Sequence, residues 1–374
     1  MSGGALRVVL TVPSLAREFG GPVDVARGLG HALRAKGVDL RLVGAGAGEG
    51  DALPVVATVR GTPIPRSFRK LRSAIDGADV VHVLGYRDPV GTKAASAAFG
   101  SKVPYLLEPC GMLRPRVRSM RAKRAFDATL GRPVVDRAAA IIATSDLERR
   151  EFVEDGVLDD RIRTRRNGIT LSPGRSERSG SIRERYGIPR DAVLVLALGR
   201  IARKKGLLDV IRAAFALPDT HVLITGPDAN DGTASSLRRA SSAMRGRVHI
   251  DPDGLWGRDK LQAFGDADCF ALPSQTENFA NAAAEAAAAG LPVVVSDACG
   301  VAEVLDRGAH RVIGVGDVDA LTAAIVELTR DDRFREAAAS ASTKLRELLD
   351  WSSLAEVQLE IYREVLSGGG TPTT

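Results

Sequence analysis

One stretch limits what this chain can fold into more than any other: residues 274–300, SQTENFANAAAEAAAAGLPVVVSDACG. It follows a short apolar run and begins as a polar loop that leads into an alanine-rich helix. Gly290 is expected just beyond the end of this helix, and Pro292 prevents the helix from continuing. A second apolar run, residues 292–295, follows at once. The pattern predicts a strand–helix–strand unit of an α/β sheet.

Two carboxylates in this unit, Glu277 and Glu285, stand eight residues apart, or roughly 12 Å along a helix. That length is close to the span from a sugar to a ribose across a diphosphate. The amides near Asn278, Phe279 and Ala280 would form a helix N-terminus, which binds phosphate. The plainer alternative is a core helix with one solvated glutamate. Buried strands on both sides argue against it, because a charged glutamate there needs a partner.

A second pattern lies upstream, in the segment LGRIARKKG of residues 198–206. Arg200 is expected to leave the end of a strand, and Lys205 to begin the following helix. Arginine offers a planar fork for phosphate oxygens, and lysine offers a point charge. Alone this is a common strand–turn–helix with surface charge. Together with the stretch downstream, it predicts two cations at one diphosphate.

Length and composition set the broader limits. A chain of 374 residues favours two domains, and a net charge of +6 favours an anionic partner such as a nucleotide, a phosphate or a membrane surface. Aromatic residues make up only 4%, which argues against stacking platforms for nucleic acid. The three cysteines have no metal-site spacing, and the apolar runs are strand-length, so we expect a cytoplasmic protein.

The expected organisation is an N-terminal domain over residues 1–171, a linker over 172–181 and a second domain over 182–351. The linker SPGRSERSGS is identified by composition. A terminal helix is expected at about 352–366. The expected strands cover residues 7–12, 39–43, 55–59, 80–84, 139–144, 192–198, 221–225, 247–250 and 269–272.

A glycine-rich segment after the second strand, GAGAGEGD at residues 44–51, imitates a dinucleotide-binding fingerprint. Its glycines do not satisfy G-x-G-x-x-G, and Pro54 stands where a helix should run. We therefore expect a loop there, and a dehydrogenase is disfavoured.

The patterns around Glu277 and Lys205 resemble those of the family-4 glycosyltransferases, which have the GT-B architecture. The resemblance implies two Rossmann-like β/α/β domains that face each other across a cleft. It also implies that the terminal helix at about 352–366 packs back on the N-terminal domain. It implies a hexosyltransferase that moves a sugar from a nucleotide sugar to a hydroxyl acceptor, with retention of configuration. No metal or other cofactor is expected, because Arg200, Lys205 and the amides of residues 278–280 can meet the charge of the diphosphate. The matching residues are Pro273, Ser274, Glu277, Phe279, Glu285, Ala286, Gly290, Pro292 and Val293, with Gly199, Arg200, Lys205 and Gly206.

The resemblance also implies site residues. The first glutamate of the motif contacts the transferred sugar and the second the ribose, so these roles fall to Glu277 and Glu285. Ala280 departs from the family, which usually has glycine there. The implied catalytic residues are Glu277, Arg200 and Lys205. The implied donor-binding residues are Gly21, Gly199, Arg200, Lys205, Gly226, Asn278, Phe279, Ala280 and Glu285.

Three further residues are expected on the acceptor side: His82, Gly111 and Met112. His82 ends an apolar strand, where open α/β sheets bind ligands, although a hydrogen-bonded core histidine is the alternative. The family often has His-x-His here, and this chain has Leu84 at the second position. Gly111 and Met112 belong to a P-x-G-M-L-x-P stretch that resembles a branch linked to surface polysaccharides.

A strongly basic segment follows, with Arg116, Arg118, Arg121, Lys123 and Arg124. This segment predicts binding to an anionic membrane surface, such as the inner membrane face, or to a phosphorylated acceptor. The alternative is a basic helix face that only meets solvent. A UDP-sugar is favoured over a GDP-sugar as the donor.

Two other functions remain open. One is a non-catalytic GT-B partner subunit. The other is a metal-dependent GT-A transferase with an Asp-x-Asp motif, which occurs at residues 251–253, 266–268 and 317–319.

Overall fold

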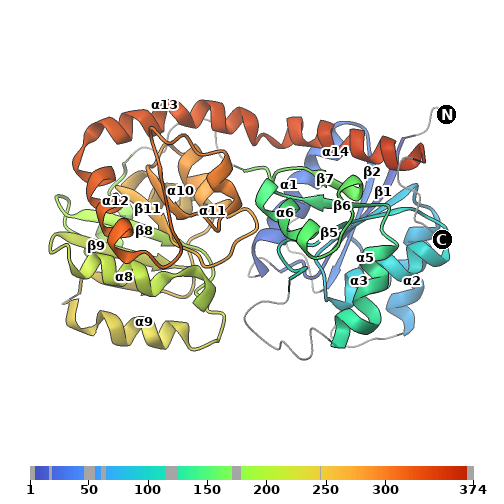
Figure 1. Ribbon diagram of the computed structural model, residues 1–374, viewed down its shortest axis with the longest axis horizontal. Helices are drawn as coiled ribbons and strands as arrows, with labels where there is room; N and C mark the ends of the chain where they lie inside the picture. The colour runs from blue at the N-terminus through green and yellow to red at the C-terminus, as the bar shows by residue number, and fades with distance from the viewer. Residues whose placement is uncertain are drawn as a thin grey trace. The chain divides into compact units, whose positions relative to one another are not determined.

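A computed structural model describes residues 5–16, 19–45, 55–59, 65–114, 125–170, 178–244 and 246–368, with backbone alone at 55–59 and 65–70. The chain divides into two compact units, each built around its own sheet (Figure 1). The first unit contains Met1–Gly168 together with Leu349–Thr374, and the second contains Ile169–Leu348.

The sheet of the first unit has seven strands in the order β3-β2-β1-β4-β5-β6-β7, and every neighbouring pair is parallel. Valine, leucine and isoleucine dominate these strands, as expected for a parallel sheet covered on both faces. The strands are β1 (Arg7–Val12), β2 (Asp39–Ala45), β3 (Val55–Val59), β4 (Val80–Leu84), β5 (Tyr105–Glu108), β6 (Ala140–Ala143) and β7 (Ile162–Thr164).

Helices cover both faces of this sheet. Residues of α1 and α14 share one apolar cluster with the strands, and residues of α2, α3, α5 and α6 share the other. The helices are α1 (Gly21–Ala35), α2 (Pro65–Asp76), α3 (Pro89–Gly100), α5 (Arg132–Asp136), α6 (Asp146–Glu154) and α14 (Trp351–Leu366), with a π-helix (Asp127–Gly131) and a 3-10 turn (Asp159–Arg161).

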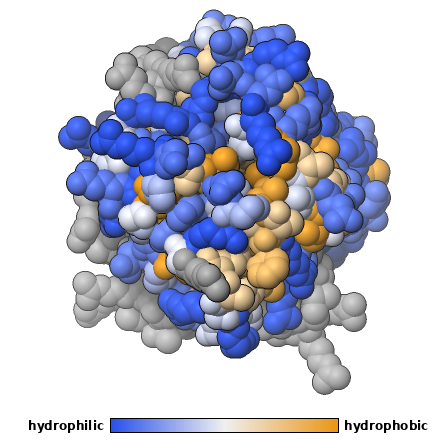
Figure 2. Space-filling model, turned by 90° about the vertical axis from the view of Figure 1, so that its left-hand side faces the viewer, coloured by the Kyte–Doolittle hydropathy of each residue, from blue (hydrophilic) through white to orange (hydrophobic). Residues whose placement is uncertain are grey.

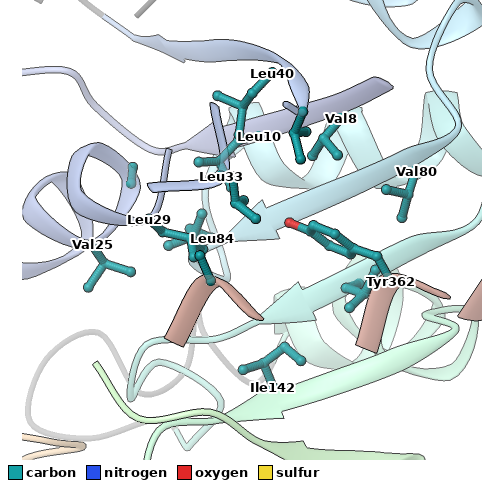
Figure 3. Packing of buried hydrophobic residues seen from close by; sticks show 14 of the residues in the cluster. Val8, Leu10, Val25, Leu29, Leu33, Leu40, Val80, Leu84, Ile142 and Tyr362 are labelled. Carbon is teal, nitrogen blue, oxygen red and sulfur yellow. The ribbon is translucent and has the colours of Figure 1, made fainter. Parts of the chain in front are cut away.

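The last helix, α14, belongs to the first unit although it follows the whole second unit in sequence. Trp351 at its start lies against Gly28 and Gly168, where an added Cβ would come within 2.2 Å and 2.3 Å of the indole. Near its other end, Tyr362 lies among Val80, Leu84 and Ile142 (Figure 3). The helix is therefore an integral part of this core.

The sheet of the second unit has six parallel strands in the order β10-β9-β8-β11-β12-β13. They are β8 (Val193–Leu198), β9 (Thr220–Thr225), β10 (Val248–Asp251), β11 (Cys269–Leu272), β12 (Val293–Ser296) and β13 (Arg311–Ile313). The strand order reverses between β8 and β11, which is where open α/β sheets place their ligands.

The helices of the second unit are α7 (Ser181–Arg185), α8 (Leu207–Phe215), α9 (Thr233–Ser241), α10 (Gly257–Asp266), α11 (Asn281–Ala288), α12 (Val318–Arg330) and α13 (Asp332–Leu348), with 3-10 turns at Arg203–Lys205, Ser242–Met244 and Gly300–Glu303. Residues of α8, α9 and α12 share one apolar cluster with the sheet. Elsewhere in the unit, α11 packs beside α13, and α10 packs beside α7.

The face shown in Figure 2 is mostly hydrophilic, with apolar residues between the charged ones. The larger apolar side chains that the second unit exposes include Phe215, Trp256 and Val315. Within the described residues, no helix is long and apolar enough to cross a membrane.

The strands expected from the sequence are all present, with ends that differ by at most two residues. Gly290 follows α11 with φ of +80°, as predicted, and Gly37 follows α1 with φ of +85°. Pro22 is the second residue of α1. The glycine-rich loop from residue 46, the basic segment 116–124 and linker residues 172–177 lie outside the described residues.

Candidate functional site

Glycines crowd the carboxyl ends of the central strands in the second unit. Gly199 follows β8 and Gly226 follows β9, and both have φ of +142°. A Cβ on Gly226 would lie 2.2 Å from the carbonyl oxygen of Gly199. Gly254, after β10, approaches the same point, since its Cβ would lie 3.4 Å from the Cα of Gly226. Three turns therefore meet with bare backbone at one sheet edge, which a ligand can approach closely.

A fourth turn places Lys205 at this edge. Gly206 has φ of +66°, and a Cβ there would lie 2.0 Å from the carbonyl oxygen of Pro273. This contact brings the turn Arg203–Lys205 against the segment that leads into α11. The amide of Gln275 donates to the carbonyl of Lys204 at 2.7 Å. Only glycine permits this approach.

The expectation that Lys205 begins a helix is wrong. Lys205 is the last residue of a 3-10 turn, and α8 begins at Leu207. The reason is the left-handed conformation of Gly206, which separates the turn from the helix. As a result the Lys205 ammonium points to Glu277, and its Nζ lies 2.5 Å from Oε2.

The local charges keep Glu277 ionised. Its side chain is only 12% exposed. Burial raises the pKa of this carboxyl, but Lys205, Lys204 and Arg200 outweigh burial and lower the pKa to about 2. The result is a carboxylate amid several cations, suited to accept hydrogen bonds from hydroxyl groups.

Helix α11 starts from a strained residue. Ala280 is its N-cap, with φ of +76° and ψ of 60°. A side chain in this left-handed region costs roughly 1–2 kcal/mol, which glycine would avoid. The side chain of Phe279 is fully buried, and its carbonyl accepts from the amide of Val301 at 2.8 Å. Phe279 can therefore meet a ligand only through its backbone.

Glu285 lies on α11, with its side chain 12% exposed. The ammonium of Lys260, on α10, donates to both carboxylate oxygens, at 3.1 Å from Oε1 and 3.0 Å from Oε2. Sequence reasoning missed Lys260. It stands 25 residues before Glu285, and only the tertiary structure joins the two.

Each Asp-x-Asp pair contains an aspartate with a structural role. Asp266 accepts from the amide of Ile182 at 2.9 Å, and Asp268 accepts from Arg183 at 2.7 Å. Asp251 accepts from the hydroxyl of Tyr186. In the third pair, Asp317 caps α12 by accepting from the amide of Ala320. Across the described ranges, no three histidine, cysteine or acidic side chains gather as metal ligands would.

The other predicted residues lie in the first unit. Gly21 is the first residue of α1, after Gly20 with φ of +81°. His82, on β4, is fully buried: its Nδ1 lies 2.8 Å from the hydroxyl of Tyr362, and its Nε2 lies 3.1 Å from Oε2 of Glu108. Burial lowers the pKa of His82. A neutral ring that donates from Nε2 and accepts at Nδ1 satisfies both contacts.

Gly111 and Met112 lie in a loop with left-handed backbone at Cys110 and Gly111. The amide of Gly111 donates to the buried carboxylate of Glu148 at 2.8 Å. The guanidinium of Arg87 donates to the carbonyl of Met112. The loop is thus tied to the rest of the unit from two sides.

Comparisons with known proteins follow this division. The family described as "Glycosyl transferases group 1" matches residues 179–345, and the "Glycosyl transferase 4-like domain" matches residues 20–168. The alpha-maltose-1-phosphate synthase of Mycolicibacterium smegmatis is 28% identical over 78% of this chain and 80% of its own length. A D-inositol 3-phosphate glycosyltransferase of Nocardioides is 26% identical over 62% of this chain. The chain spans about half of that relative's length, 54%.

Among solved structures, Anabaena HepE in complex with UDP and glucose is similar over 96% of this chain and 99% of its own, with a TM-score of 0.79 and 18% identity. This likeness establishes the GT-B fold and rules out the GT-A alternative. Together the two family matches account for most of the chain. The chain therefore belongs to the group 1, or family-4, glycosyltransferases of GT-B fold, which transfer a sugar from a nucleotide sugar with retention of configuration.

Proposed function

We propose that this chain is a hexosyltransferase that takes its sugar from a UDP-sugar and passes it to a hydroxyl acceptor. The second unit binds the donor, and the first unit binds the acceptor. The observation that carries the proposal is the pair formed by Lys205 and Glu277, at 2.5 Å beside the glycine-lined sheet edge. The complex of HepE with UDP and glucose supports the choice of nucleotide.

The proposed donor contacts follow from the side chains on this edge. Arg200 and Lys205 meet the charge of the diphosphate, which grows on the leaving group during transfer. Helix α11 starts at Asn281 with Ala280 as its N-cap, so residues 278–280 precede the helix and, contrary to expectation, do not form its N-terminus. We propose that their backbone amides add donors beside the start of α11. The glycines at 199 and 226 would let the backbone approach the nucleotide, and Gly21 is proposed as a further donor-binding residue.

The two glutamates have different proposed roles. Glu277 orients the transferred sugar by accepting hydrogen bonds from its hydroxyls, because it is ionised and mostly buried. Lysine has three donor protons, so Lys205 can hold Glu277 and a phosphate oxygen together. Glu285 accepts hydrogen bonds from the ribose. We assign no covalent step to either carboxylate.

On the acceptor side, we propose that Gly111 and Met112 line the binding surface. We propose that His82, buried on β4, stabilises that surface without being exposed on it. We further propose that the protein works in the cytoplasm and that the basic segment 116–124 meets an anionic membrane surface.

A panel of UDP, GDP, ADP and their sugars, measured by thermal shift, tests the donor. A ligand at 100 times its dissociation constant should stabilise the protein by about 2.7 kcal/mol. Arg200→Ala and Lys205→Ala should each weaken diphosphate binding by roughly 1.5–3 kcal/mol and leave nucleoside binding unchanged. Glu277→Gln should keep nucleotide affinity and lose turnover. Full transfer activity in that variant would remove Glu277 from the proposed site.

The remaining alternative is a non-catalytic partner subunit, which Leu84 favours because it replaces a histidine common in the family. Leu84 is fully buried on β4. Slow hydrolysis of the nucleotide sugar, measured as release of free sugar, distinguishes an enzyme from a non-catalytic subunit. An enzyme releases sugar, whereas a non-catalytic subunit binds the nucleotide and releases none.

We propose that transfer needs no divalent metal, because Arg200, Lys205 and the start of α11 already supply positive charge for the diphosphate. Activity should survive an excess of EDTA, with at most modest stimulation by magnesium. Complete loss in EDTA with recovery in manganese would contradict this. Asp251→Ala with Asp253→Ala is the matching variant, and it should leave metal response unchanged.

A further inference from the structure

We infer that Lys260 is a positioning residue of the donor site, which holds the Glu285 carboxylate in the orientation that receives the ribose hydroxyls. The inference rests on the proposed function, in which Glu285 is the ribose acceptor. Nothing in the sequence patterns or in the family matches assigns a role to Lys260.

The contact between Lys260 and Glu285 has a geometry that fixes the orientation of the carboxylate. A single ammonium lies nearly equidistant from both oxygens of Glu285, at 3.1 Å and 3.0 Å. The side chains are only 20% and 12% exposed, so solvent screens the pair weakly. A contact through both oxygens fixes the plane of the carboxylate.

The position of Lys260 is set by the packing of α10. At the start of the helix, the indole of Trp256 donates to the carbonyl of Asp253 at 3.1 Å, and Leu255 is 3% exposed. At its end, the carboxylate of Asp266 is 1% exposed and accepts from three amides of the segment leading into α7. Those amides belong to Ser179, Gly180 and Ile182. A helix held at both ends presents its lysine at a defined point.

The surroundings of Glu285 explain why a cation is placed there. It is the only charged residue of α11, whose sequence is NAAAEAAA, and the alanines from 283 to 288 are fully buried. Burial among methyl groups disfavours an ionised carboxylate, and a nearby cation favours it. Lys260 therefore places a cation beside Glu285 and fixes the direction of its carboxylate.

The test compares the binding of UDP and 2′,3′-dideoxy-UDP to the full chain by calorimetry. The wild type should prefer UDP by about tenfold or more, because only UDP offers hydroxyls to Glu285. Lys260→Met should lose most of this preference by weakening UDP, and its affinity for the dideoxy compound should stay within about twofold of the wild type. Lys260→Arg should restore part of the preference, since it keeps a cation.

Two controls keep the result specific. Arg258→Met removes a cation from the same helix two residues away, on a different face, and should retain the wild-type preference. The double variant Lys260→Met with Glu285→Gln should show the same preference for UDP over the dideoxy compound as Glu285→Gln alone. Both changes act on one contact, so their effects should not add. If Lys260→Met does not fold, Lys260→Gln takes its place.

The outcomes separate this inference from the proposed function. A wild type that binds none of UDP, GDP and ADP refutes the donor proposal. A wild type that binds UDP without preferring it over the dideoxy form refutes the inference and leaves the donor proposal standing. The inference is also overturned if Lys260→Met keeps the preference, or if it weakens both ligands equally, as a purely structural brace would. If GDP or ADP is the nucleotide bound, its dideoxy form is used instead.

Discussion

A single residue, Ala280, stands in a conformation that its type disfavours. With φ of +76°, it occupies the left-handed region that precedes α11. Ala280→Gly should stabilise the protein by about 0.5–1 kcal/mol, because relief of strain exceeds the added entropy of the unfolded chain. Urea denaturation measures the change.

The matched control is Ala283→Gly, inside α11 and fully buried. It should destabilise by about 1 kcal/mol or more, because glycine is unfavourable within a helix. A loss of stability in Ala280→Gly comparable with that of the control would show that the left-handed backbone carries no strain.

Glu148 gives the protein a pH-dependent stability. Burial raises the pKa of its carboxyl to about 7, although the amides of Thr144 and Gly111 favour the ionised form. A raised pKa means that the folded state retains a proton that the unfolded state releases. The contribution of Glu148 is therefore fully present below pH ~4.5 and is lost as pH rises to about 7, by roughly 3 kcal/mol.

Glu148→Gln should remove most of this slope, because the amide does not titrate. The free energy of unfolding of both proteins, measured by urea across this pH range, should converge or cross as the wild type loses stability. Parallel curves for the wild type and the variant would place the titration elsewhere.

At the residue scale, sequence reasoning found what lies within one segment. Glu277 and Glu285 were singled out by their spacing. The turn geometry of Lys205 was missed, because only the contact of Gly206 with Pro273 reveals why that turn is not a helix. Lys260 was missed altogether, because no local pattern links it to Glu285.

Among the elements, α14 packs on the first unit through a close contact of Trp351 with Gly28 and Gly168, which we call the seat of α14. Gly28→Ala would place a Cβ only 2.2 Å from the nearest atoms of the Trp351 indole, so the two would overlap. Overpacking of this kind costs roughly 1–3 kcal/mol, against a gain of up to about 1 kcal/mol in helix propensity, so a net loss is expected. Thermal unfolding of the full chain measures it.

Gly100→Ala serves as the control, because Gly100 ends α3 and an added Cβ there meets nothing within 4 Å. It should be neutral or stabilising. A gain of stability in Gly28→Ala as well as in Gly100→Ala would contradict the close contact between Gly28 and Trp351.

Element prediction succeeded where apolar runs were long and bounded by glycine or proline. The strands β1, β4, β8 and β11 are such runs. Three strands were not predicted: β5, with four residues, and the outer strands β7 and β13, with three each. No period can be read from so few residues. The π-helix Asp127–Gly131 also has no simple sequence pattern.

At the scale of the molecule, the second unit is a continuous segment with its own core. A fragment of residues 169–348 should fold alone and bind UDP with nearly the affinity of the full chain, because all proposed donor residues except Gly21 lie in it. Circular dichroism and calorimetry check this. A folded fragment without UDP affinity would move essential donor contacts to the first unit.

The first unit should behave differently. Residues 1–168 lack α14, so His82 loses its contact with Tyr362 and the space beside Gly28 and Gly168 is left without its indole. This fragment should be unstable, and addition of a peptide covering residues 349–368 should stabilise it. Length and linker composition predicted two domains, and the family resemblance implied that the last helix returns to the first. The contact of Trp351 with Gly28 and Gly168 depends on packing that no sequence pattern shows.

The return of α14 to the first unit has a consequence for how such genes recombine. The second unit is, in effect, an inserted module, with the chain entering it after residue 168 and leaving it after residue 348. A single crossover near residue 168 would join a foreign α14 to the seat formed by Gly28 and Gly168. A double crossover would exchange the module and keep the native α14 with its own seat. Inheritance of the donor half as a unit therefore favours two breakpoints.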